Sequence, residues 1–156
     1  METTYIKTPL GIAKITGDAE GVSVISILDE GDSSSTIPVI LQESVSQLND
    51  YFEGKRTHFT FKLNPSGTEF QQKVWKGLLE IPFGKTISYL ELSKKLGDIK
   101  AIRAVASANG KNPLWIVVPC HRVIGNDGSL TGYAGGLWRK KWLLEFEKPS
   151  NQQSLF

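Results

Sequence analysis

The only cysteine of the chain stands in the sequence Pro119-Cys120-His121-Arg122, next to an imidazole and a guanidinium. Cationic or hydrogen-bonding neighbours lower the pKa of a thiol below its usual value of about 8.5 and raise the thiolate fraction. Proline ends a sheet ladder, so we expect the thiol where the chain leaves a strand. The segment predicts a nucleophilic cysteine, and a buried structural thiol beside a surface histidine is the alternative.

Two conditions limit the chemistry of this cysteine. Adjacent side chains on a strand point in opposite directions, so Cys120 and His121 cooperate only if they lie on a turn or at a helix start. The base of a cysteine protease is usually distant in sequence from its nucleophile, which makes a hydrolase the weaker alternative. A single cysteine forms no internal disulfide, and beside two histidines, His58 and His121, it does not predict a structural zinc site.

The segments on either side of Cys120 are expected to position it. Leu114–Val118 is a short apolar run that predicts a buried strand. Residues 125–136 contain five glycines and predict an irregular loop. Such a loop can be shaped closely around a ligand. A plain surface loop is the alternative.

Two capping boxes predict helices further upstream. Residues 68–71 (Thr-Glu-Phe-Gln) begin the first helix. Its apolar stripe consists of Phe70, Val74, Leu78 and Ile81. Residues 88–91 (Ser-Tyr-Leu-Glu) begin the second helix, which we expect to run through Leu96 and to end at Gly97.

Residues 88–108 together predict a helix-turn-helix. The later helix begins with Lys100 and Arg103 and continues with small residues from Ala104 to Ala108. Small residues let a helix enter a groove closely, and a single arginine at its start reaches further. An ordinary helical hairpin with an alanine-rich packing face fits this segment equally well.

The first third of the chain predicts an antiparallel meander followed by a helix. The expected strands are Thr4–Thr8, Ile12–Thr16 and Val22–Leu28, separated by turn signals. Thr36 is the expected helix cap, with Pro38 in the first turn. Leu41, Val45, Leu48 and Phe52 recur on one face of this helix. A last strand at 59–63 precedes the expected domain boundary at 64–67.

Composition limits the class of protein. The chain has 156 residues, of which 40% are hydrophobic, enough for one ordinary or two small domains. The net charge is −4 over residues 1–67 and +6 over residues 68–156, and a basic half indicates a polyanionic partner. The first residues lack the basic-then-apolar pattern of a signal peptide, and no apolar stretch approaches about 18 residues, so we expect a cytoplasmic protein without a membrane partner.

Several spaced motifs resemble the O6-alkylguanine-DNA alkyltransferases. Pro119–Val123 carries the resemblance, preceded by Asn112-Pro113 and followed by Tyr133–Leu137. Ile87–Tyr89 and Arg103–Val105 agree in the same order. The resemblance implies an α+β fold with a ribonuclease-H-like N-terminal domain, which holds an antiparallel sheet and a helix. A mainly helical, winged-helix-like domain with the helix-turn-helix follows. The implied bounds are 1–67 and 68–148, with a polar tail at 149–156.

The family resemblance implies DNA repair by a protein that is consumed. An alkyl group would pass irreversibly from O6 of guanine, or from O4 of thymine, in double-stranded DNA to Cys120, in a monomer without a cofactor. His121 would remove the thiol proton through a water, and Glu147 would orient the imidazole. Asn112 would brace this network, and Tyr89 would donate a hydrogen bond to the leaving base.

The resemblance also implies how the base is reached and held. Arg103 would enter the duplex and fill the space of the extruded nucleotide. The expected DNA contacts are Arg103, Ala104, Ser88, Lys100, Lys111 and Arg122. The expected substrate contacts are Val123, Tyr133, Ala134, Gly135 and Trp115. Ala134 stands where many members carry serine, so a side-chain hydroxyl contact to O6 is absent. Cys120 is intact, whereas non-catalytic relatives carry tryptophan there. A lesion-binding or regulatory helix-turn-helix protein without chemistry is the rival hypothesis.

Overall fold

The structure, a computed structural model, describes residues 1–148, and the tail predicted at 149–156 lies outside the described residues. The chain folds as two units. Residues 1–66 and 113–117 form the first unit, and residues 67–112 with the chain from 118 onward form the second. The first unit therefore includes a short segment from the middle of the second half of the sequence. Among the described residues, no helix is long and apolar enough to cross a membrane.

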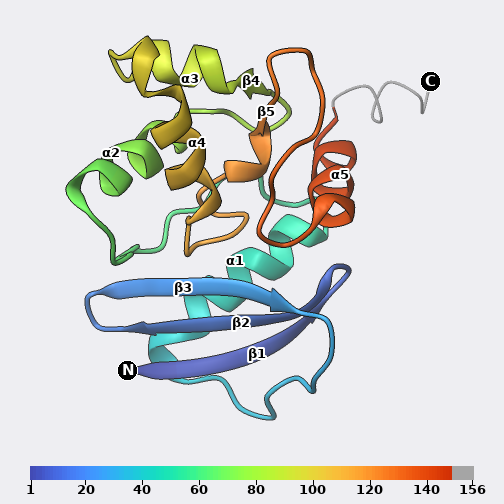
Figure 1. Cartoon of the computed structure of the whole chain (residues 1–156). Coiled ribbons are helices and arrows are strands. Elements are labelled where there is room, and N and C mark those ends of the chain that lie inside the picture. Colours follow the sequence, from blue (N-terminus) through green and yellow to red (C-terminus); the bar gives the residue numbers. More distant parts are fainter. Residues whose placement is uncertain (149–156) are drawn as a thin grey trace. The chain divides into compact units, whose positions relative to one another are not determined.

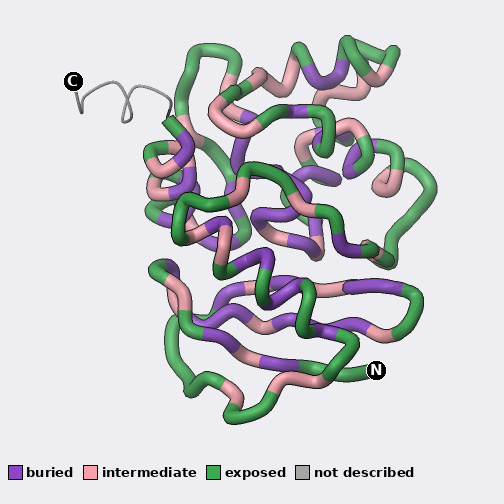
Figure 2. The backbone as a smooth tube through the Cα atoms, turned by 180° about the vertical axis from the view of Figure 1, so that it is seen from behind, coloured by how far each residue is buried: buried purple, intermediate pink, exposed green. Residues whose placement is uncertain are grey.

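The first unit is built on the predicted meander. Its strands β1 (Glu2–Thr8), β2 (Gly11–Asp18) and β3 (Gly21–Leu28) pair antiparallel in the order β1-β2-β3. Buried and exposed residues alternate along β1, whereas β2 is buried over most of its length (Figure 2). Helix α1 (Gln42–Phe52) packs beside the sheet (Figure 1). The apolar face predicted for this helix is confirmed at Val45 and Leu48, which are buried.

The predicted start of this helix was wrong. A 3-10 turn, η1 (Val39–Leu41), precedes α1, and neither has a cap from Thr36. Pro38 has an extended backbone with ψ of 142°, and proline also disfavours helical geometry in the residue before it. Helical geometry therefore begins only after Pro38.

Two predicted strands are reduced to single bridges on β3. Leu63 pairs with Val22, and Leu114 pairs with Ile25, both in parallel sense. The Ile25 amide donates to Pro113 O at 2.8 Å, and Trp115 donates back to Ile25 O at 3.0 Å. Pro113 has no amide hydrogen to extend this ladder, and Ile116 has a φ of 74° that turns the chain away. The strands expected at 59–63 and 114–118 were therefore wrong in extent.

The second unit begins with helix α2 (Glu69–Leu78), and its predicted capping box between Thr68 and Gln71 is confirmed. Its buried side chains are Val74, Trp75 and Leu78. Trp75 also donates from Nε1 to Ala108 O at 2.9 Å. Phe70 is 39% exposed, so its predicted place on the buried stripe was wrong. The buried face of the helix is turned toward Trp75 instead, whose ring packs inward and whose N–H finds a buried carbonyl.

The predicted helix-turn-helix is present. Helix α3 (Tyr89–Lys95) has the expected capping box between Ser88 and Glu91. The turn contains Gly97 with a φ of 91°, a left-handed conformation that glycine adopts without a Cβ clash. A short 3-10 turn, η2 (Ile99–Ala101), leads into α4 (Ile102–Gly110). The later helix thus begins after Lys100, which lies in the 3-10 turn.

Short elements connect the helices to the chain around Cys120. The 3-10 turn η3 (Cys120–Arg122) continues into β5 (Val123–Ile124), and β5 pairs parallel with β4 (Ile87–Ser88). This pairing joins the start of α3 to the segment that follows Cys120. Residues 125–136 form the predicted irregular loop, and helix α5 (Leu137–Phe146) follows it.

Candidate active site

Cys120 is the first residue of η3 and is 4% exposed. The expectation that Cys120 and His121 lie on a turn or helix start is confirmed. Burial raises the pKa of the Cys120 thiol to about 11, although a hydrogen bond from Asn112 and the charge of Lys140 act in the lowering direction. The expectation of a thiol pKa below its usual value was wrong, because burial outweighs the neighbours that lower it. The resting side chain is therefore a thiol at neutral pH.

His121 is fully buried and forms a pair with Glu147. Its Nε2 lies 2.9 Å from Glu147 Oε2. Burial lowers the pKa of His121, so the imidazole is neutral, and its Nε2 carries the proton that the carboxylate accepts. The other ring nitrogen, Nδ1, is then an acceptor, and it is buried with no hydrogen-bond partner among the described residues. Nδ1 can therefore act as a base on the side of the His121 ring that faces away from Glu147.

Arg122 completes this cluster from the same turn. Its Nε donates to Glu147 Oε1 at 2.8 Å, and its Nη2 donates to Oε2 at 3.0 Å. Its Nη1 donates to Ile81 O at 2.7 Å. Burial alone would raise the pKa of Glu147, but His121 and Arg122 outweigh it and hold this pKa at about 2. Arg122 is 6% exposed. The structure thus places it as the buried partner of a carboxylate and not at a surface that DNA could contact.

Lys140 on α5 is a site residue that the sequence reasoning missed. Its side chain is fully buried, and Nζ donates to Val123 O at 2.7 Å and to Thr131 O at 2.8 Å. Burial lowers its pKa to about 8, and its charge acts on Cys120. Lys140, Leu143 and Glu147 share one helical face, all buried. The spacing of these three residues could have indicated that Lys140 is buried. The basic run at 139–141 hid this signal, because such runs usually lie on a solvent-exposed face.

Two asparagines brace the chain around the thiol. Asn112 donates from Nδ2 to Val118 O at 2.8 Å, and its hydrogen bond to the Cys120 side chain acts to lower the thiol pKa. Asn109 donates from Nδ2 to Cys120 O at 3.5 Å. Both side chains are buried. The position of Cys120 is therefore fixed by amides from the end of α4 and from the residues after it.

A pocket of about 520 Å³ lies between α3, α4 and the glycine-containing loop. Its lining comprises Tyr89, Ala106, Ser107, Gly110, Thr131, Gly132, Tyr133 and Ala134. The Tyr89 hydroxyl donates to Thr131 O at 3.4 Å, and burial raises the pKa of this phenol, so it keeps its proton at neutral pH. The structure thus brings together three residues expected at the substrate, Tyr89, Tyr133 and Ala134.

A second pocket of about 320 Å³ shares Tyr89 and Ala106 with the first and adds Arg103. Arg103 and Ala104 are exposed on the first turn of α4, and Lys100 is exposed just before it. Lys111 is exposed after the other end of α4, and Ser88 is the half-buried cap of α3. The expected DNA contacts other than Arg122 thus lie on the helix-turn-helix or directly beside it.

The remaining expected substrate residues have other placements. Val123 is buried, and its carbonyl accepts from Lys140. Gly135 O accepts from Nη1 of the buried Arg139 at 3.0 Å, which anchors the end of the loop. Trp115 belongs to the first unit, where its backbone pairs with Ile25. A contact of Trp115 with substrate stays a prediction.

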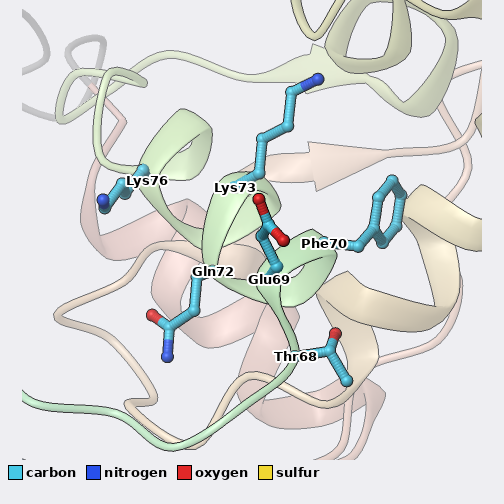
Figure 3. A pocket seen from close by; sticks show the side chains of 6 residues that line it. All are labelled: Thr68, Glu69, Phe70, Gln72, Lys73 and Lys76. Atoms are coloured by element: carbon cyan, nitrogen blue, oxygen red, sulfur yellow. The ribbon is translucent and has the colours of Figure 1, made fainter.

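A larger pocket of about 790 Å³ lies elsewhere, on the exposed face of α2. Figure 3 shows the six labelled side chains that line it, Thr68, Glu69, Phe70, Gln72, Lys73 and Lys76. Phe70 and Lys76 leave the helix in opposite directions (Figure 3). This pocket is lined by neither cysteine nor histidine, so it is not the candidate site for transfer to a thiol. Among residues 1–148, no group of three His, Cys, Asp or Glu side chains could hold a metal ion.

Comparisons with known families agree with this geometry. Residues 69–149 match the family model described as "6-O-methylguanine DNA methyltransferase, DNA binding domain". Residues 1–65 match the model described as "6-O-methylguanine DNA methyltransferase, ribonuclease-like domain". The two matches together cover nearly the whole chain.

Similar proteins carry related names. A probable methylated-DNA–protein-cysteine methyltransferase of Acanthamoeba polyphaga mimivirus is 47% identical over 97% of this chain and 100% of its own length. The methylated-DNA–protein-cysteine methyltransferase of Methanosarcina barkeri is 43% identical over 92% of this chain and 94% of its own. A crystal structure of Mycobacterium tuberculosis OGT in complex with DNA has a TM-score of 0.84 at 45% identity, covering 92% of this chain and 91% of that one.

Proposed function

The chain belongs to the 6-O-methylguanine DNA methyltransferase family, and from this premise we propose that Cys120 is the residue that accepts the alkyl group. The protein repairs DNA by transferring an alkyl group from O6 of guanine to a cysteine of its own chain. Cys120 is the only cysteine. A thioether is a stable product, so each molecule carries out one transfer and is not regenerated.

Proton removal from Cys120 begins the proposed mechanism. The observation that supports it most directly is His121, whose Nε2 is held by Glu147 while its buried Nδ1 has no protein partner among the described residues. A water between Sγ and Nδ1 would carry the proton to the ring. Glu147 then stabilises the imidazolium that forms, because its pKa of about 2 keeps it ionised.

Displacement at the alkyl carbon follows. The thiolate attacks this carbon, the S–C bond forms, and the C–O6 bond breaks with its electron pair on the purine. Tyr89 gives the purine a hydrogen bond or a proton as this charge grows. Lys140 lies with its Nζ 6.0 Å from the centre of the Tyr89 ring, and its charge also acts on Cys120. It stabilises negative charge on both groups while its two carbonyl contacts hold Val123 and Thr131 in place.

The pocket between α3, α4 and the loop would hold the extruded base. Tyr133 and Ala134 form its loop wall, and the main chain around Gly135 would read the purine edges. Arg103, in the adjoining pocket, would fill the space left in the duplex. Lys100, Ala104, Lys111 and Ser88 would contact the DNA backbone from the helix-turn-helix. Arg122 has a different role, because it holds Glu147 inside the unit.

The deciding experiment uses duplex DNA that carries a labelled O6-methylguanine. After one incubation, the intact mass of the protein should rise by one methylene, and the label should map to the peptide that contains Cys120. Cys120→Ser is the matched control and should stay unmodified. A folded wild-type protein that binds the duplex without any gain in mass would favour the non-catalytic lesion-binding alternative.

We also propose that the protein is cytoplasmic and that its two domains have different roles. A lone cysteine that must stay a thiol until it meets its substrate requires a reducing compartment. Residues 68–148 would carry the chemistry and the DNA contacts, and residues 1–67 would support them. The alkyl group itself comes from the DNA, so the proposed reaction needs no cofactor.

A further inference from the structure

Asn109 is a buried polar side chain to which the reaction described above gives no task. It is 1% exposed and belongs to the last turn of α4. Its Nδ2 donates to the main-chain carbonyl of Cys120 at 3.5 Å, while its Oδ1 accepts no hydrogen bond from the described residues. A buried carbonyl oxygen without a partner costs stability, so an amide kept at this place requires an explanation.

The neighbours of Asn109 are groups that face the substrate pocket. Ala106 lies one turn earlier on the same face of α4, and Gly110 follows Asn109 directly. Both line the pocket together with Tyr89. The Asn109 amide also interacts with the Tyr89 phenol in the direction that lowers its pKa, although the larger effect of burial raises it. Asn109 therefore holds the main chain of the nucleophile from a helix whose neighbouring residues line the pocket together with Tyr89.

We propose that Asn109 is a positioning residue for alkyl transfer, whose carboxamide ties the backbone of Cys120 to the phenol of Tyr89. One N–H of Nδ2 holds the Cys120 carbonyl. In the proposed reaction the other N–H would support the phenol oxygen. As Tyr89 gives its hydrogen to the leaving base, negative charge grows on this oxygen, and a nearby N–H donor stabilises it. This inference rests on the proposed function, because it assigns Asn109 a role in that reaction.

The test compares Asn109→Leu with the wild-type protein. Leucine has nearly the same shape but no polar atoms, so it also removes the unsatisfied Oδ1. We expect thermal stability to be equal or higher and the affinity for O6-methylguanine duplex to change by less than about twofold. The single-turnover rate constant should fall by about tenfold or more. Gln47→Met, which removes a buried amide in the first unit, is the matched control and should leave the rate unchanged.

A double-mutant cycle separates this role from general packing. If Asn109 acts through Tyr89, Asn109→Leu slows transfer clearly less in the Tyr89→Phe background than in the wild-type background, because only its bond to the Cys120 carbonyl is then lost. A second readout is the ionisation of the Tyr89 phenol, followed by ultraviolet difference titration with Tyr89→Phe as the blank. Its midpoint should rise in Asn109→Leu, because the lowering effect of the amide is lost.

Equal slowing in both backgrounds, or an unchanged phenol titration, would overturn the inference. An Asn109→Leu variant that transfers the methyl group as fast as the wild type would do the same. These outcomes differ from failure of the proposed function, in which the wild-type protein itself would acquire no methyl group on Cys120. If the leucine variant is poorly folded, Asn109→Asp serves as the second variant. It keeps the shape but removes the N–H donors, and we expect it to slow transfer through Tyr89 in the same cycle.

Discussion

Arg122 and His121 bind the same carboxylate from adjacent positions of one 3-10 turn. His121 Nε2 lies 2.9 Å from Glu147 Oε2, and Arg122 Nε lies 2.8 Å from Oε1. Adjacent residues of a strand could not reach one partner in this way, because their side chains point to opposite faces. The turn that follows Pro119 therefore lets both side chains reach Glu147. It also leaves Nδ1 of His121 available to accept a proton.

The first prediction concerns the charge of Glu147. Glu147→Gln keeps a hydrogen-bond partner for His121 but removes the charge that stabilises the imidazolium. We expect the single-turnover rate constant to fall about 100-fold, which corresponds to about 2.7 kcal/mol. Quenched-flow measurement of methyl transfer from O6-methylguanine duplex gives this constant. Glu145→Gln, an exposed site two residues away on α5, is the control. A Glu147→Gln rate within a factor of three of the wild type would contradict the assigned role.

The second prediction concerns stability. Arg122→Met leaves the buried Glu147 carboxylate without its two guanidinium contacts, so we expect a loss of about 3–5 kcal/mol in the free energy of unfolding. The double variant Arg122→Met/Glu147→Gln should recover part of this loss, because no unpaired charge stays buried. Urea denaturation followed by circular dichroism measures both. Arg56→Met breaks a partly exposed pair with Asp50 at 4.0 Å and should cost less than about 1 kcal/mol.

Arg122→Met should also change how the free energy of unfolding depends on pH in acid. The pKa of Glu147 is about 2 in the folded protein and about 4.3 in an unfolded chain. The ionised carboxylate therefore contributes stability above about pH 4.3, and this contribution is lost as the pH falls toward 2. Without Arg122, the folded pKa rises and the contribution shrinks. The midpoint of acid unfolding should then move to higher pH.

Local patterns predicted the parts of this fold that depend on neighbours in sequence. The capping boxes at Thr68 and Ser88 need only residues three positions apart, and both are present. The burial of Arg122 and Lys140 depends on partners 25 and 17 residues away. From their charge alone, both side chains would be expected at the surface. In the apolar segment at 114–118 only Leu114 forms a bridge to β3, and an apolar run does not distinguish a full strand from a single bridge.

The third prediction separates base extrusion from chemistry. Arg103 is exposed at the start of α4 and lines the smaller pocket beside Tyr89. Arg103→Ala should slow repair of O6-methylguanine in duplex DNA by about 10- to 100-fold, since unstacking a base costs a few kcal/mol. Reaction with free O6-benzylguanine should be nearly unchanged, because this substrate needs no extrusion. Equal losses on both substrates would refute the role assigned to Arg103. Lys94→Ala, an exposed cation on α3, is the control for loss of charge.

The fourth prediction concerns the pH dependence of transfer, which two buried groups should shape in opposite directions. Burial lowers the pKa of His121 below 6.5, so its base is available at neutral pH and is lost only in acid. The pKa of Lys140 is about 8, so the positive charge beside Cys120 is present below this pH and disappears above it. The rate should therefore be lost in acid, at a pH below 6.5, reach a plateau near neutrality, and fall again near pH 8.

Lys140→Met tests the alkaline limb of this profile. Without the charge, the thiolate and the developing charge on Tyr89 lose a stabilising partner, so the plateau should fall by about tenfold, or about 1.4 kcal/mol. The decline near pH 8 should vanish, because the group that titrates there is gone. Lys141→Met, the exposed neighbour on the same helix, should keep both the plateau and the decline. Single-turnover rates from pH 5.5 to 9.5 decide the matter. A decline near pH 8 that persists in Lys140→Met would assign it to another group and leave Lys140 only its structural hydrogen bonds to Val123 and Thr131.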